Sequence, residues 1–170
     1  MSIILGYDPS TLREKVDLVA AGERLDELGE QRNTAALNEK IGLLRLVGRI
    51  DEAWDIANQA LRQARFSGDR EQLCMARIRR AIVAQAQGKF DHALIDLTSC
   101  ATEARDHYWS TVEACALQHR GRVHFDLTDY PAALMDFRTA ATIRSRIGAP
   151  AGDIESSLVA VAIAESFVDA

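Results

Sequence analysis

A short block of residues recurs at a fixed spacing of 40, and this internal repeat constrains the fold more than any other feature. Gly48-Arg-Ile-Asp-Glu-Ala53 returns as Gly88-Lys-Phe-Asp-His-Ala93 and, in weaker form, as Thr128-Asp-Tyr-Pro-Ala-Ala133. The same offset relates the small residues Ala60, Cys100 and Ala140, and the apolar residues Leu43, Val83 and Val123. A period of this length indicates a chain that stacks copies of one supersecondary unit.

Each repeat is expected to be a pair of antiparallel helices. A glycine such as Gly48 or Gly88 ends the first helix, and Asp51 or Asp91 then lies in the first turn of the second, where a carboxylate complements the helix dipole. In the third repeat Pro131 takes the matching first-turn position, where its missing N–H costs little. Runs of alternating β-branched residues are absent, which argues against a sheet.

The pattern predicts an all-α chain of about eight helices in a single domain over residues 1–170. A leading helix is expected over 9–28, with Asp8 as its N-cap and Pro9 as its first residue. Three repeats and a terminal helix follow, over 32–66, 70–106, 109–147 and 152–168.

The repeated residues resemble the tetratricopeptide family. The shared pattern is a glycine, an apolar or aromatic residue two places later, an acid, an alanine, and another small residue seven places on. Gly121 also matches the family's glycine in the middle of the first helix. The long period is similar to that of variants attached to bacterial transcriptional and peptide-responsive regulators. The resemblance implies a bacterial protein with a right-handed solenoid of helical hairpins.

In this family the first helices of successive repeats line a concave groove that binds polypeptides. The residues that the family's pattern places there are Asn38, Arg45, Met75, Ile78, Ile82, Gln85, Gln118, Arg122 and Phe125. This mixed apolar and basic lining suits an amphipathic or acidic peptide. Two alternatives stay open: the surface is unused, or the chain's own ends fill the groove.

Lys40, Arg80 and Arg120 form a basic column, one residue per repeat at the 40-residue offset. Such a column could bind the carboxylates of a partner. It could instead pair with Asp96 and Asp136, which repeat at the same offset. We favour internal pairing, because positions in stacked repeats recur for packing reasons.

The terminal helix is apolar on two sides, whereas the end of a repeat array usually has a polar outer face. At 100° per residue, Leu158 lies on one side with Val161 and Val168, while Val159, Ile163 and Phe167 lie on another. One side can pack on the third repeat, and the other then needs a cover. We expect a homodimer or a partner helix at Leu158, Val159, Ile163 and Phe167; the alternative is that the chain covers both sides itself.

No residue pattern predicts catalysis, a cofactor or a metal. The chain has no glycine-rich phosphate loop or nucleophile elbow, and no two of its four histidines stand four residues apart. Three cysteines without a CxxC spacing favour a reduced, cytoplasmic setting. No apolar run is long enough to span a membrane, and a net charge of −5 makes nucleic acid an unlikely partner.

The sequence therefore predicts a non-catalytic protein–protein interaction module that binds a polypeptide in its groove and self-associates. A second hypothesis is a regulatory domain that senses a peptide or small ligand. Nucleic-acid binding through arginine-rich first helices is the weakest of the three.

Overall fold

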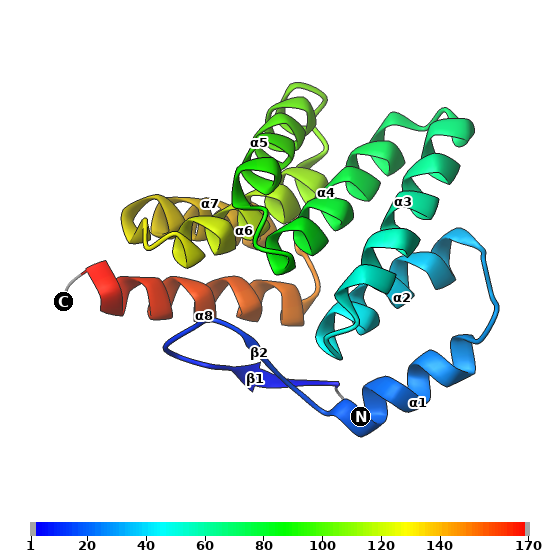
Figure 1. Ribbon diagram of the computed structural model, residues 1–170. Coiled ribbons are helices and arrows are strands. Elements are labelled where there is room, and N and C mark those ends of the chain that lie inside the picture. The colour runs from blue at the N-terminus through cyan, green and yellow to red at the C-terminus, as the bar shows by residue number, and fades with distance from the viewer. Residues whose placement is uncertain (1–2, 169–170) are drawn as a thin grey trace.

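The computed structural model describes residues 3–168, which form a two-stranded ribbon followed by eight helices (Figure 1). The ribbon consists of β1 (Ile4–Tyr7) and β2 (Glu14–Val16). The helices are α1 (Leu18–Leu28), α2 (Thr34–Leu46), α3 (Ile50–Ser67), α4 (Arg70–Ala86), α5 (Phe90–Asp106), α6 (Ser110–Asp126), α7 (Tyr130–Arg146) and α8 (Ala151–Val168). None of the helices in this part of the chain is both long and apolar enough to cross a membrane.

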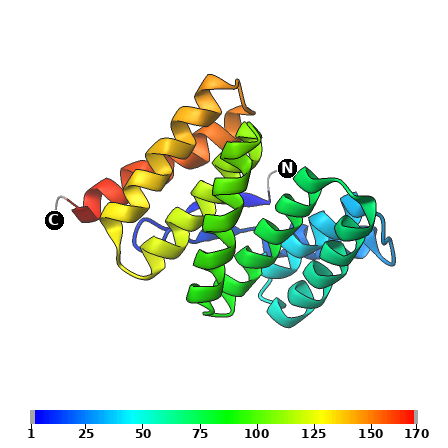
Figure 2. The same cartoon turned by 90° about the horizontal axis from the view of Figure 1, so that it is seen from above.

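The helices pack as successive antiparallel hairpins, which confirms the expected arrangement. Each of the helices α2 to α8 packs against its neighbours in the sequence, and α4 also contacts α2 and α6, the first helices of the adjacent hairpins. Figure 2 shows the hairpins following one another from one end of the molecule to the other. From α2 onward, the three observed hairpins and the last helix begin and end within two residues of the predicted limits of the repeats and the terminal helix.

The columns that define the repeat are buried at the helix–helix contacts. Ala53, Ala93 and Ala133 are all fully buried, so the same position meets the same environment in each hairpin. The columns of Ala60 and Leu43, with their counterparts 40 and 80 residues later, are buried as well. Small side chains at these positions let the two helices of a hairpin approach closely.

The helix ends reveal a structural period of half the repeat. A residue with left-handed backbone follows each of six helices, at positions 48, 68, 88, 108, 128 and 148. Four are glycines, whereas Tyr108 and Thr128 adopt φ angles of 60° and 62° in spite of their side chains. At five of the six ends, the next backbone N–H reaches the carbonyl five residues earlier, as in Trp109 to Ala104 at 2.8 Å. These turns reverse the chain after each helix.

The leading helix expected over 9–28 is wrong in its first half, and so is the expectation that strands are absent. β1 and β2 pair antiparallel, and α1 begins only at Leu18. The Asp8 carboxylate accepts the N–H groups of Ser10 and Thr11 at 2.8 and 2.9 Å, which closes a tight turn. An Asx-turn and a helix N-cap use the same residue types. Asp8-Pro9 was therefore interpreted as the start of a helix, whereas it forms a turn. Asp17 is the true N-cap of α1.

Candidate functional site

The N-terminal ribbon lies beside α1 and α8, on the side of the molecule away from α5 (Figure 1). In the segment that ends with β2, alternate side chains face opposite ways. Leu12, Glu14 and Val16 are buried or half-buried, whereas Arg13 and Lys15 are exposed. Within β2 this alternation is that of an extended strand with one face packed on the protein, and Leu12 continues it from outside the strand.

Leu12 anchors one end of this segment in an apolar cluster formed by α6, α7 and α8. Its side chain is 4% exposed and packs with Phe125, Phe137 and Ala160. Its backbone has a left-handed φ of 57°, which a residue with a Cβ adopts at a cost of roughly 1–2 kcal/mol. Burial of a leucine side chain is worth about 1.5–3 kcal/mol and offsets this strain.

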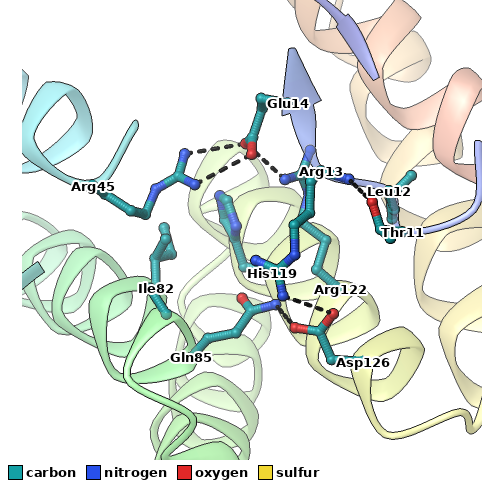
Figure 3. A pocket seen from close by; sticks show the side chains of 11 residues that line it. Thr11, Leu12, Arg13, Glu14, Arg45, Ile82, Gln85, His119, Arg122 and Asp126 are labelled. Carbon is teal, nitrogen blue, oxygen red and sulfur yellow. Dashed lines mark hydrogen bonds and ion pairs between the residues drawn. The ribbon is translucent and has the colours of Figure 1, made fainter. Parts of the chain in front are cut away.

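Glu14 occupies the middle of the segment and lies between two arginines (Figure 3). Arg45 of α2 donates two hydrogen bonds to its two oxygens, at 3.1 and 3.2 Å, and Arg122 of α6 donates one at 2.7 Å. Burial alone would raise the pKa of Glu14, but the charges of Arg122 and Arg45 outweigh it and lower the pKa to about 2. Glu14 is therefore an ionised, nearly buried carboxylate in a two-arginine clamp.

Val16 completes the segment at its other end. It packs with Ile3 against the apolar cluster of α1 and α2, which contains Ala21 and Leu43. On the opposite strand, the ring of Tyr7 lies 5.3 Å from the Arg122 guanidinium. The ribbon thus bridges the two ends of the helical array.

A small cavity of about 40 Å³ lies next to the clamp, with Ile82, Gln85 and His119 in its wall. Two buried atoms at this place, Nδ1 of His119 and Nε of Arg122, have no hydrogen-bond partner among the described residues. Burial lowers the pKa of His119 well below its ordinary value, and the charges of Arg122 and Arg45 act in the same direction. His119 is therefore neutral at pH 7. Gln85 donates a hydrogen bond of 2.8 Å to Asp126 across the cavity.

The structure brings together four of the nine predicted groove residues: Arg45, Ile82, Gln85 and Arg122. Asn38 and Met75 are half-buried and lie outside this cavity.

The groove prediction is wrong for three of its residues, because they are buried and do not line an open surface: Ile78, Gln118 and Phe125. Ile78 belongs to the central core. Residues of α8 cover the other two: Ser157 donates a hydrogen bond of 2.6 Å to Gln118, and Phe167 packs edge-on against Phe125.

Sequence reasoning missed the residues that the ribbon brings to the site, above all Leu12 and Glu14. The signal that could have found them is the alternation of Leu12, Glu14 and Val16 with two basic residues. His119 and Asp126 were missed as well, since the family's pattern places neither in the groove.

The basic column pairs inside the protein. Arg80 donates to Asp96 at 3.0 Å, and Arg120 forms two bonds with Asp136 at 2.7 and 2.8 Å. Lys40 differs, because its ammonium group donates to the carbonyl oxygens of Gly29 and Gln31 at 2.6 and 2.7 Å. The column therefore joins neighbouring helices and closes the end of α1.

The predicted association face of α8 is partly covered by the chain itself. Phe167 stacks on Tyr130 with ring centroids 4.7 Å apart, and Ile163 packs against the same cluster. Val159 is half-buried, and Leu158 stays 54% exposed. Leu158 and Val168 are thus the large apolar side chains of α8 that stay exposed among the described residues.

A second hollow, open to solvent and about 550 Å³ in volume, lies between α1 and α3. Apolar residues such as Leu25 and Ile56 form its floor, and both acidic and basic residues, including Glu52 and Arg49, surround it. The mixture of charges gives this cleft no preference for one class of ligand.

Comparisons with known proteins bear on the fold. No family model and no curated protein matches this sequence. Among solved structures, the chain is similar to BtubC (BKLC) from P. vanneervenii, with a TM-score of 0.56 and 17% identity over 89% of this chain and 71% of that one. At this level of identity, the likeness shows a shared arrangement of packed helices and nothing about activity.

Proposed function

We propose that this chain is a non-catalytic protein–protein interaction module of the tetratricopeptide type, which binds an extended polypeptide between α2, α4 and α6. The 40-residue repeat of helical hairpins, with the same alanine column buried in each, supports the fold part of the proposal. The likeness to BtubC is compatible with it.

One observation carries the functional part: a segment of the chain that ends in the extended strand β2 already lies on this surface. Residues 12–16 meet it with an apolar side chain, a carboxylate and a second apolar side chain. The surface therefore offers the apolar contacts and charged hydrogen-bond donors by which grooves hold peptides. The acceptor in this case belongs to the chain itself.

A peptide screen tests the proposal. The 170-residue chain carrying Leu12→Ala, which weakens the docking of the ribbon, is panned against a library of random ten-residue peptides, and the binders are measured by fluorescence anisotropy. We expect saturable binding that Ile82→Glu abolishes, because this side chain lines the cavity.

The matched control is Ile95→Glu, on an exposed position of α5. It introduces the same charge away from the groove and is expected to leave binding unchanged. A screen without binders, or binders that ignore Ile82→Glu, would contradict the proposal.

We also place the protein in the cytoplasm. Cys74, Cys100 and Cys115 all carry free thiols, and the first two are buried. Thiols that are not paired in disulfides suit a reducing compartment.

A further inference from the structure

We infer that residues 12–16 stand in for the protein's partner, whose extended segment presents a carboxylate flanked two residues away on each side by apolar side chains. To bind, this segment displaces the N-terminal ribbon. The inference rests on the proposed function and specifies the chemistry of the ligand.

The spacing follows from the three contacts of the segment. Leu12, Glu14 and Val16 meet the α6–α8 cluster, the arginine clamp and the α1–α2 cluster in that order. From Glu14 to Val16 the chain is a strand, which rises about 3.3 Å per residue, so these two subsites lie about 7 Å apart, and the Leu12 subsite comes two residues before them. In a helix the first and third of these side chains would share a face and the carboxylate between them would turn away from it, so the site selects a ligand that is not helical.

The charge of the site calls for a carboxylate. Among the described residues, Glu14 is the acid paired with Arg45 and also the acid paired with Arg122. When the ribbon leaves, two guanidinium groups lose the acid that neutralises them. Their hydrogen bonds to both oxygens of Glu14 show that one carboxylate is enough to engage the pair.

The ribbon is an imperfect ligand, which is why another segment can replace it. Leu12 is held with a left-handed backbone, and Nδ1 of His119 and Nε of Arg122 stay without hydrogen bonds beside the cavity. A segment that binds with relaxed backbone and places a polar group in this cavity removes both penalties.

The covalent tether works in the opposite direction. An attached segment competes at an effective concentration in the millimolar range, so a free ligand binds weakly while the ribbon is docked. The apparent dissociation constant rises in inverse proportion to the fraction of molecules whose groove is open. Loosening the ribbon must therefore strengthen the binding of a partner.

The experiment uses the 170-residue chain and two fluorescent peptides. The first probe copies residues 8–17, and the second carries glutamine in place of the glutamate that corresponds to Glu14. The proteins are the unaltered chain, Leu12→Ala, Glu14→Gln and, as control, Lys15→Ala, whose side chain is exposed.

We expect Leu12→Ala and Glu14→Gln each to tighten binding of the acidic probe by about tenfold or more, because 1.4 kcal/mol of lost docking gives a factor of ten. Lys15→Ala is expected to change nothing. The glutamine probe is expected to bind at least about tenfold more weakly than the acidic probe. Amide hydrogen exchange in residues 3–17 of the unaltered chain should become faster when the acidic probe binds.

Charge reversal provides a second variant. Arg122→Glu should reject the acidic probe and accept one with arginine at that position, and circular dichroism shows whether the variant is folded. If Leu12→Ala binds the acidic and glutamine probes equally, or binds library peptides that lack an acid while ignoring both probes, the inference fails and the proposed function stands. If neither probes nor library peptides bind, both fail.

Discussion

At the scale of single residues, Gly121 lies where α6 and α7 approach each other closely. A Cβ at this position would lie 2.6 and 2.8 Å from ring carbons of Phe137 and 3.2 Å from the carbonyl oxygen of Ala133. These contacts are too short for a methyl group, and the fully buried Phe137 has little room to move. A glycine is therefore needed at this position in the middle of α6 for packing.

Gly121→Ala is expected to lower the free energy of unfolding by about 1–3 kcal/mol, the usual cost of overpacking. Gly42→Ala, on the first helix of another hairpin, meets nothing within 4 Å and is expected to raise it by about 0.5–1 kcal/mol through helix propensity. Urea unfolding measures both. Changes of the same sign in the two variants would contradict the packing argument.

His119 is expected to make stability depend on pH below its ordinary pKa. Burial and two nearby arginines lower its pKa in the folded chain. Above pH 6.5 the histidine is neutral in both states and contributes nothing. As the pH falls below 6.5, the unfolded chain takes up a proton that the folded chain resists, and stability is lost.

Urea unfolding at pH 7.5 and 5.5 checks this expectation. His119→Gln should show a smaller loss of stability between the two pH values than the unaltered chain. His92→Gln, at an exposed position, should keep the full loss. An unchanged pH dependence in His119→Gln would show that the histidine is protonated in the folded state.

At the scale of elements, ion pairs hold the two helices of a hairpin together with unequal strength. In the third repeat Asp136 is 3% exposed and receives two bonds from Arg120. In the second repeat Asp96 and Arg80 are about one quarter exposed and share one bond. Water screens the second pair far more than the first.

We therefore expect Asp136→Ala to destabilise the chain by about 3 kcal/mol, since it leaves a mostly buried arginine unpaired. Asp96→Ala should cost about 1 kcal/mol or less. Thermal and urea unfolding measure the two variants side by side. Equal losses would show that burial does not decide the strength of the pair.

Element ends show where sequence patterns suffice and where they do not. Four of the six left-handed residues that follow helices are glycines, so the sequence itself indicates that a helix ends there. Tyr108 and Thr128 occupy the same structural position without that signal, and only the repeat period identifies them. In the N-terminal segment the local signal was misleading, because Asp8 caps a turn and not a helix.

At the scale of the whole molecule, self-association through α8 stays a prediction. Twice the chain mass of 18.7 kDa is expected by light scattering after size-exclusion chromatography. Leu158→Asp should shift the species to the monomer, since Leu158 is the most exposed large apolar side chain of α8 among the described residues.

Ile95→Asp places the same charge on exposed α5 and should leave the mass unchanged. A clean monomer for the unaltered chain would rule out the homodimer. The packing of Phe167 on Tyr130 would then be part of the cover that the chain itself gives to α8.

The sequence by itself determined the hairpins, their limits and their buried columns. Helix caps, chain-reversing residues and small contact residues are local signals. They can be recognised in the sequence because the corresponding positions recur in each of the three repeats. The pairing of Arg80 and Arg120 with their aspartates was predictable for the same reason, because both partners repeat at one offset.

Only the tertiary structure decided what occupies the inner surface. Glu14 and Arg122 meet across 108 residues of sequence, and no periodic signal connects them. Gln118 and Phe125 are likewise covered by α8, and the sequence does not show where this helix docks. Each contact between the non-repeating ends and the array occurs only once, so it leaves no periodic pattern in the sequence. Such contacts are decided by the energy of the folded chain.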